Sequence, residues 1–158
     1  DAVVASLMIC EMAAVYKLRG ISLKEFMDSI YEKYGMYLNT VLNFAFEGAS
    51  GMQKMTDIMS SLRENTPTSF ADKKVVKVAD YKESAVKDII TGESKVINLP
   101  KSNVLSYRME SGDTFIVRPS GTEPKIKIYI TAKASSREEA EEKLSVLSEC
   151  IKNLLGIE

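Results

Sequence analysis

The residues best suited to chemistry in this 158-residue chain lie in one short segment, Arg118 to Lys125, which reads Arg-Pro-Ser-Gly-Thr-Glu-Pro-Lys. Arg118 carries a planar guanidinium that can hold two phosphate oxygens at once. Ser120 and Thr122 supply hydroxyl donors, and Gly121 can adopt a positive φ that lets consecutive backbone N–H groups converge on an anion. The segment therefore predicts a phosphate-binding loop.

The residues around this loop add to the case for an anion site, although an ordinary turn would explain the same pattern. Pro119 and Pro124 stiffen both ends of the loop, which reduces the entropy lost when a ligand orders it. Lys125 and Lys127 place positive charge along the following strand, and residues 95–133 hold seven Lys or Arg against three Asp or Glu. Ser-Gly-Thr between prolines is also common turn material, so physical reasoning alone leaves both interpretations open.

Composition excludes several classes of protein. The chain is 45% hydrophobic and 27% charged, which is typical of a folded globular protein. Its net charge of −1 argues against a general nucleic-acid binder. The chain contains no His, so it holds no Ser-His-Asp triad, Cys-His pair or His-based metal site. Cys10 and Cys150 form no CxxC motif, and we predict two buried thiols, which suits a reducing compartment.

The chain begins with an apolar run. Residues 2–15 are too few to span a membrane, which takes about 18 such residues, and no charged segment precedes them as in a signal peptide. We predict a helix that is buried on more than one side and closes at Gly20. Because the run starts at Asp1 without an initiator Met, we expect a piece of a longer protein. We also expect self-association of this piece through residues 2–15.

Two further helices and a strand are predicted in the first half of the chain. Ser22 and Glu25 have the spacing of a capping box for a helix that ends at Gly35. Residues 37–46 are predicted to form an edge strand. The next helix carries an apolar stripe, which we interpret as core packing rather than a binding groove, made of Met52, Met55, Ile58, Met59 and Leu62.

The second half of the chain reads mainly as strands. The polar, proline-containing stretch from Glu64 to Asp72 predicts a linker, so we divide the chain into domains 1–66 and 67–158. Strands are expected at residues 74–78, 104–109, 114–117 and 125–133, with a turn at 111–113 and a short helix at 84–90.

The last predicted element is a helix that begins with a capping box of Ser135 and Glu138. Its apolar stripe comprises Ala140, Leu144, Leu147, Ile151 and Leu154. Its other face is charged, as expected for a helix that covers a sheet and faces water.

Beyond these local patterns, the run from Arg118 to Lys125, followed by Ile-Lys-Ile-Tyr, strongly resembles a known motif. That motif is the C-terminal phosphate-binding loop of the α-D-phosphohexomutases, the phosphoglucomutase/phosphomannomutase family. Residues 1–5 and 11–14 resemble the helix after the sugar-binding loop in the family's third domain, and residues 31–35 are similar to the end of its next helix. The resemblance covers nearly the whole chain in the family's order, and residues 1–35 are most similar to the phosphoglucomutase branch.

The resemblance implies a fold and an activity. The implied fold is α+β: an antiparallel sheet packed by helices, like the TATA-box-binding-protein-like domain four of the mutases, after a mainly helical α/β remnant of domain three. The implied full-length protein is a cytoplasmic isomerase of carbohydrate metabolism that interconverts hexose 1-phosphate and hexose 6-phosphate. It would act as an intramolecular phosphotransferase through an enzyme phosphoserine and a hexose 1,6-bisphosphate, with Mg²⁺ held by aspartates in another domain.

By residue, the resemblance implies that the phosphate that is not being transferred is bound by Arg118, Ser120, Gly121 and Thr122, with Lys125 within the motif. The family's nucleophilic serine loop, metal loop and sugar loop are missing from this sequence. We therefore expect no catalytic residue, no metal ligand and no bound cofactor in this chain, which would be inactive alone. Its partners would be a phosphosugar and the N-terminal domains of the same protein, with no nucleic acid and no membrane.

Three alternatives stay open at this point. The chain could belong to a phosphomannomutase or a phosphoglucosamine mutase, because the loops that would distinguish these sugars are not in the sequence. It could be a stand-alone module that binds phosphorylated ligands. It could also be a structural interaction domain, in which the loop is only a turn.

Overall fold

The computed structural model describes residues 1–48 and 50–156, and its contacts group the chain into two units, Asp1–Met36 and Tyr37–Glu158. The first unit holds two helices, α1 (Ala2–Leu18) and α2 (Leu23–Tyr34). The second holds the sheet and two more helices. The domain boundary predicted between residues 66 and 67 stays a prediction.

In the first unit, α1 and α2 begin where the sequence indicates. The capping box of α2 is confirmed: the Ser22 hydroxyl accepts the Glu25 N–H, and the Glu25 carboxylate accepts the Ser22 N–H at 2.7 Å. The expected burial of α1 is not found within this chain, because none of its residues is buried and Leu7 is 66% exposed. Cys10 is likewise exposed rather than buried, since it lies on this helix. Among the described residues, no helix is long and apolar enough to cross a membrane.

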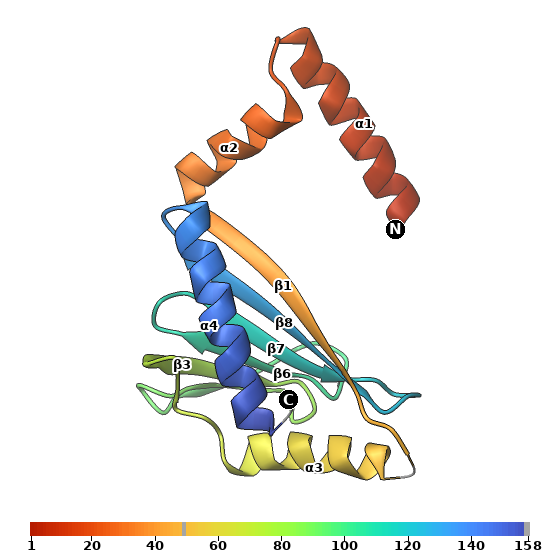
Figure 1. Ribbon diagram of the computed structural model, residues 1–158, viewed down its shortest axis with the longest axis vertical. Coiled ribbons are helices and arrows are strands. Elements are labelled where there is room, and N and C mark those ends of the chain that lie inside the picture. The colour runs from red at the N-terminus through yellow and green to blue at the C-terminus, as the bar shows by residue number, and fades with distance from the viewer. Residues whose placement is uncertain (49, 157–158) are drawn as a thin grey trace. The chain divides into compact units, whose positions relative to one another are not determined.

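An antiparallel sheet forms the centre of the second unit (Figure 1). Its strand order is β1-β8-β7-β6-β3-β4-β5, and β2 pairs with β3 beside this path. The strands are β1 (Met36–Ala45), β2 (Ser69–Phe70), β3 (Lys73–Asp80), β4 (Ala85–Asp88), β5 (Ser94–Val96), β6 (Leu105–Met109), β7 (Thr114–Pro119) and β8 (Lys125–Ala134). With helices α3 (Gly51–Glu64) and α4 (Arg137–Leu155), this architecture confirms the α+β fold.

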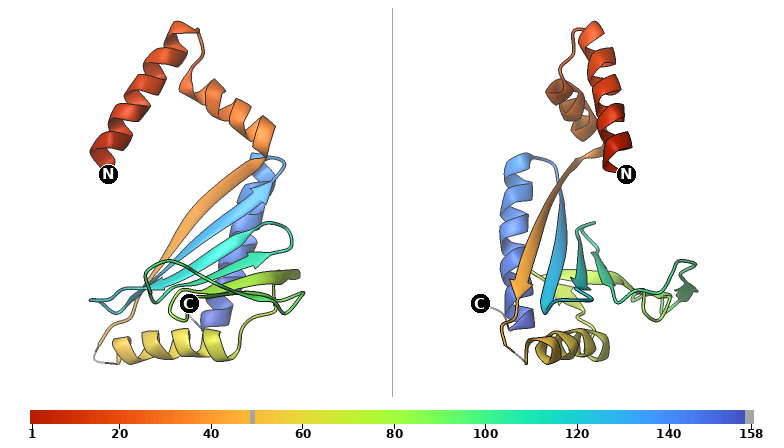
Figure 2. Two further views of the ribbon diagram at one scale, coloured as in Figure 1. Left: turned by 180° about the vertical axis from the view of Figure 1, so that it is seen from behind. Right: turned by 90° about the vertical axis from the view of Figure 1, so that its right-hand side faces the viewer.

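One face of the sheet packs against α4, and the view from behind shows the strands in front of that helix (Figure 2). The alternation expected in β8 is confirmed, because the side chains on its helix-facing side are fully buried: Ile126, Ile128, Ile130 and Ala132. Each large apolar side chain buried in this way contributes roughly 1.5–3 kcal/mol to folding. On the opposite face, the alternation turns the intervening polar side chains of β8 toward solvent.

Aromatic rings fill the centre of this core. Tyr107 and Phe115 stack with ring centroids 4.5 Å apart, and Phe70 meets Phe115 edge-on at 4.4 Å. The buried Tyr107 hydroxyl donates to the backbone carbonyl of Leu62 in α3 at 3.3 Å. Burial raises the pKa of Tyr107, so it stays neutral and keeps this hydrogen bond.

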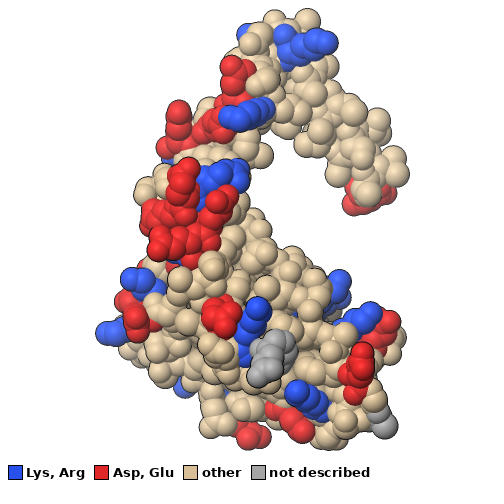
Figure 3. All heavy atoms as spheres, in the orientation of Figure 1, with Lys and Arg blue, Asp and Glu red and all other residues tan. Residues whose placement is uncertain are grey.

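The start of α4 lies one residue later than the sequence predicted. Ser136, not Ser135, is the N-cap residue, and its hydroxyl accepts the N–H of Glu139 at 3.2 Å. The Glu139 carboxylate turns back and accepts hydrogen bonds from the hydroxyl and from the N–H of Ser135. These hydrogen bonds lower the pKa of Glu139 to about 2. Glu138 is thus not the partner of Ser135; hydrogen bonds from its own backbone N–H and from the Ser136 hydroxyl lower its pKa. Figure 3 shows the acidic side chains that gather over the first turns of α4.

Three other expectations also need correction. The predicted stripe of α4 ends on Leu155, which is buried, whereas Leu154 is 46% exposed. The segment 84–90 contains the strand β4 (Ala85–Asp88) rather than a helix, because pairing with β3 and β5 on its two sides overrides its weak helical pattern. The predicted linker contains the short strand β2, so it is partly tied to the sheet.

Helix α3 packs its methionines into the core and is fixed at its end by charge. Met55 and Met59 are buried, as expected of a core stripe, whereas Met52 is exposed.

Near the last turn of α3, Arg63 donates to Asp80 of β3 at 2.8 Å and to Asn103 at 2.6 Å. Burial acts to raise the pKa of the Asp80 carboxyl, but the hydrogen bonds from Arg63 and from backbone N–H groups outweigh it and hold that pKa below its usual range.

The turn between β6 and β7 lies where it was predicted and contains a buried carboxylate. Gly112 has φ +88°, which a residue with a side chain rarely adopts. Asp113 is only 2% exposed, and it accepts the Lys133 N–H at 2.7 Å and the Ser111 hydroxyl at 2.6 Å. These bonds tie the hairpin turn to the end of β8.

Replacing this carboxylate should destabilise the fold. Asp113→Ala leaves the Lys133 N–H without its acceptor, so we expect a loss of about 1–3 kcal/mol in the free energy of unfolding, measured by chemical denaturation. Asp113→Asn keeps an oxygen acceptor for Lys133 and should lose clearly less. Equal losses in the two variants would show that the hydrogen bond to Lys133 is not the important contact.

Candidate functional site

The predicted phosphate-binding loop connects β7 to β8 and forms one wall of a pocket of about 260 Å³. Arg118 lies at the end of β7, and Lys125 begins β8. The pocket is lined by Arg118, Pro119, Ser120, Gly121, Glu123, Lys125, Lys127 and Tyr129. Four of the five predicted site residues therefore share one pocket. The fifth, Thr122, is exposed at the tip of the loop and does not line the pocket.

The most informative feature of the pocket is a pair of cations held opposite each other. Arg118 of β7 and Lys127 of β8 are direct partners in the sheet register, so their side chains project from the same face. Both are exposed, and in the part of the chain that the structure describes neither makes a hydrogen bond or ion pair with an acidic side chain. Like charges directly opposite in a sheet repel, and a bound anion would remove that repulsion.

The loop holds itself in shape through its own backbone. The Ser120 N–H donates to the Lys125 carbonyl at 2.8 Å, and the Lys125 N–H donates to the Glu123 carbonyl at 2.8 Å. The Ser120 hydroxyl oxygen accepts the N–H groups of Thr122 at 3.4 Å and Glu123 at 3.2 Å. Because its oxygen accepts twice, the Ser120 hydroxyl hydrogen is the part of this group that can donate to a ligand.

The positive φ expected at Gly121 is not present. Gly121 has a negative φ, and the N–H groups of the next two residues point to Ser120 instead of converging on an empty anion nest. A Cβ at Gly121 would meet no atom within 4 Å. The glycine is therefore not required by the backbone, and it leaves open space beside the pocket.

Lys125 is less available than the other cations of the pocket. Its ammonium lies 3.1 Å from the Glu123 carboxylate, an ion pair in which both side chains are about half exposed. Exposed pairs of this kind add little to stability. The pair nevertheless reduces the negative potential of Glu123 at a site that otherwise presents positive charge.

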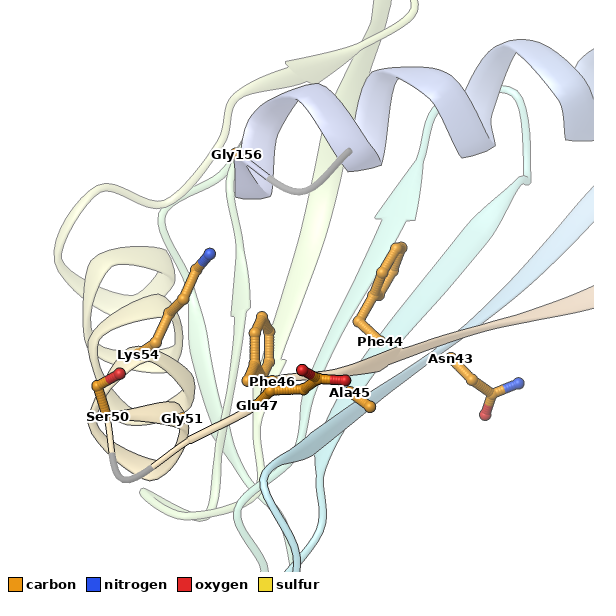
Figure 4. A pocket seen from close by; sticks show the side chains of 9 residues that line it. All are labelled: Asn43, Phe44, Ala45, Phe46, Glu47, Ser50, Gly51, Lys54 and Gly156. Atoms are coloured by element: carbon orange, nitrogen blue, oxygen red, sulfur yellow. The ribbon is translucent and has the colours of Figure 1, made fainter.

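A second part of the chain supports the base of the loop. The Phe46 N–H, just after β1, donates to the Pro124 carbonyl at 2.8 Å. The first residue of α3, Gly51, packs so closely that a Cβ would lie 2.6 Å from the Phe46 carbonyl oxygen and 3.0 Å from the Pro124 Cβ. Figure 4 shows Phe46 and Gly51 at a larger hollow of about 760 Å³, which Phe44 and Lys54 also line.

Sequence reasoning named Lys127 as a source of charge but did not include Tyr129 in the pocket. The signal was present in the strand alternation, because Lys125, Lys127 and Tyr129 occupy every second position of β8. The cross-strand pairing of Lys127 with Arg118 could not be predicted from the sequence, because it depends on the register of β7 against β8. Among the described residues, no three His, Cys, Asp or Glu side chains cluster as metal ligands would.

Comparison with known proteins identifies the family. Residues 62–148, which include the whole loop, match the family model described as the phosphoglucomutase/phosphomannomutase C-terminal domain. The chain belongs to the phosphoglucomutase/phosphomannomutase family. The resemblance seen in the sequence is thereby confirmed.

Relatives within the phosphoglucomutase/phosphomannomutase family are similar over most of this chain. It is 40% identical over 121 residues to a phosphoglucomutase of Staphylococcus saprophyticus, covering 76% of this chain and 22% of the relative. It is 35% identical over 148 residues to a phosphoglucomutase of Staphylococcus aureus, covering 93% of this chain and 26% of the relative. The chain thus spans about a quarter of the length of these relatives.

A solved structure shows the same fold. It is the open form of parafusin (pp63), described as an exocytosis-sensitive phosphoprotein and phosphoglucomutase from Paramecium. The TM-score is 0.51 with 17% sequence identity, over 85% of this chain and 22% of parafusin. At this identity, the likeness supports the α+β fold of this family member and nothing further.

Two glycine substitutions should separate support of the loop from contact with a ligand. Gly51→Ala forces the Phe46–Pro124 junction apart, so we expect a lower melting temperature. Gly121→Ala meets no protein atom and should melt like the wild type, but its methyl group should weaken binding of a phosphate ester at the pocket, measured by NMR shifts of the loop amides. Unchanged binding in Gly121→Ala would contradict a ligand at this pocket.

Proposed function

We propose that the protein to which this chain belongs is a phosphoglucomutase that interconverts glucose 1-phosphate and glucose 6-phosphate. The observation that carries this proposal is that Arg118 and Lys127 lie opposite each other, without an acidic partner among the described residues, beside a loop rich in hydrogen-bond donors. Support for glucose as the sugar comes from the names of the relatives. The protein would act in the cytoplasm as an isomerase of carbohydrate metabolism.

In this proposal, the chain binds the phosphate that is not being transferred. The Arg118 guanidinium holds two phosphate oxygens, and the Lys127 ammonium opposite it supplies a second positive charge. The Ser120 hydroxyl donates its remaining hydrogen, and Gly121 leaves room for the phosphate to approach the backbone. Thr122 donates from the loop tip once the site closes on its substrate. Lys125 contributes least, because Glu123 already partners its ammonium.

The chemistry itself would take place elsewhere in the full-length protein. A phosphoserine would donate its phosphoryl group, and the hexose 1,6-bisphosphate formed would turn round and return the other one. Mg²⁺ would assist this transfer, and the resemblance places its aspartate ligands in another domain. We therefore propose that the chain is inactive by itself.

Binding at a remote phosphate is useful for such a reaction. Interactions away from the reacting atoms can be used to align the other end of the substrate and to close the site against water. Exclusion of water matters here because water would otherwise hydrolyse the phosphoserine. A rigid loop with charge and hydroxyl donors suits either phosphate of the bisphosphate, which must present its two ends in turn.

Removing Arg118 in the full-length protein should weaken both binding and turnover. For Arg118→Ala, we expect KM to rise and kcat to fall, with kcat/KM reduced roughly a hundredfold through loss of charge-assisted hydrogen bonds. The assay follows formation of glucose 6-phosphate from glucose 1-phosphate. Mannose 1-phosphate serves as the competing substrate, and faster turnover of it would show that the sugar has been misassigned.

The matched control is Arg108→Ala. Arg108 is an exposed arginine on the same face of the sheet, in β6, but it does not line the pocket. Its loss should leave kcat/KM within about twofold of wild type, because a distant exposed charge is screened by solvent. Equal effects of the two substitutions would reduce the role of Arg118 to general surface charge.

We also propose that α1 contacts the preceding domains of the full-length protein and that, without them, the 158-residue chain self-associates through residues 2–15. This helix exposes Val3, Leu7 and Met8 together. Light scattering of the 158-residue chain at millimolar concentration should show oligomers larger than a dimer, which Leu7→Lys reduces in size. Ile90→Lys, at an exposed apolar residue outside α1, should not disperse them. A monomeric wild-type chain would refute the proposal.

A further inference from the structure

Strand β1 is an exposed sheet edge without the usual protection. It is the terminal strand of the sheet and, among the residues described, pairs only with β8. Its ten residues, Met-Tyr-Leu-Asn-Thr-Val-Leu-Asn-Phe-Ala, include no charge and no proline. Their burial alternates without interruption, so no bulge distorts the strand. Edge strands normally carry such devices because they otherwise pair with other chains.

The two edges of the sheet differ in this respect. At the opposite edge, β5 is only three residues long and carries Lys95 at its centre. Short length and a lysine are two common ways to protect an edge. Within the described residues of this chain, one edge is therefore protected and the other is available.

The direction of the main-chain groups in β1 follows from one hydrogen bond. The Phe46 N–H points toward β8, where Pro124 accepts it. Since these groups alternate in direction along an antiparallel strand, the N–H and C=O of every odd-numbered residue from Tyr37 to Ala45 point away from β8. Five consecutive odd positions thus offer donors and acceptors to another strand.

The sequence of β1 is complementary to itself. If two copies run antiparallel with Val41 opposite Val41, then Asn39 lies opposite Asn43, and Leu38 lies opposite Phe44. The Asn39 side-chain oxygen already accepts the Thr131 hydroxyl at 2.6 Å, which leaves its amide N–H groups to donate to the facing Asn43. Leu38 and Phe44 are both half-buried against the core on the helix side.

We propose that β1 is a dimer interface, in which it pairs antiparallel with β1 of a second copy about a two-fold axis at Val41. The pairing would form about ten main-chain hydrogen bonds and join the two sheets into one. A two-fold interface requires the same surface of both copies to make the contact, and β1 pairing with β1 meets this requirement. The proposal does not depend on the function proposed above.

The surroundings of β1 leave space for this pairing. The hollow of about 760 Å³ beside Phe44 and Phe46 lies at the end of β1, where Leu38 of the second copy would arrive (Figure 4). Helix α4 packs on β8, the strand next to β1. The two α4 helices would thus be about three strand spacings apart, roughly 14 Å, which exceeds the 8–10 Å of packed helices.

The test uses the full-length protein and charge at the two-fold axis. Val41, which is 43% exposed, is replaced by Lys in one variant and by Glu in another. Each should raise the dimer dissociation constant about tenfold or more in sedimentation equilibrium, because like charges then face each other. Mixing the Lys and Glu variants should restore a dimer, since opposite charges meet at the axis.

Two controls separate the edge from general surface effects. Val41→Thr keeps an uncharged β-branched side chain and should stay dimeric. Val96→Lys places a lysine on β5, the opposite edge, at a residue 78% exposed, and should also stay dimeric. Mutase activity should persist in all four variants, so loss of activity would speak against the proposed function or the fold rather than this interface.

Two outcomes would overturn the proposal. One is a wild-type protein that is monomeric over the concentrations tested, which would indicate that a strand of the same polypeptide or another partner covers the edge. The other is a wild-type dimer that persists in both charged variants, which would place the interface elsewhere.

Discussion

The electrostatic repulsion between Arg118 and Lys127 is the constraint on which the site depends. The ladder between β7 and β8 places them directly opposite each other, and the neighbouring pair on the other face, Val117 and Ile128, is fully buried. A shift of β8 by one residue against β7 would relieve the repulsion. It would also move the buried side chains of β8 to the face exposed to water. Burial of the apolar face therefore holds two positive charges side by side, and the proposed anion would neutralise them.

The geometry of the loop depends on parts of the chain that are distant in sequence. Pro124 is held by Phe46 from the end of β1, and both are packed against Gly51 at the start of α3. The other end of α3 is fixed to β3 by Arg63 and Asp80. The helix thus acts as a brace between the base of the loop and the far strands of the sheet. Changes in α3 that touch no ligand can therefore alter the shape of the pocket.

The sequence was sufficient where local chemistry decides the structure. The capping box at Ser22 and the alternation of β8 follow from neighbouring residues alone, and the loop motif identified the family. It was insufficient where distant contacts decide. The segment 84–90 becomes β4 because strands lie on both sides of it, and the pairing of Arg118 with Lys127 needs a register that no local pattern contains.

Errors of a single residue had a related cause. Two adjacent serines precede α4, and either could cap it; the choice of Ser136 follows from the packing that also selects Leu155 over Leu154. The negative φ of Gly121 has a different cause. The Ser120 hydroxyl oxygen already accepts the N–H groups that follow Gly121, so these groups do not turn toward an anion.

The two hydrogen bonds accepted by the Ser120 oxygen also bear on chemical selectivity. A mutase must keep a reactive phosphoryl group away from every hydroxyl except its own acceptor. With its lone pairs engaged by Thr122 and Glu123 N–H groups, the Ser120 oxygen is a poor nucleophile, although its hydrogen can still contact the ester. In the proposed role, the loop would therefore hold a phosphate closely without being phosphorylated by it.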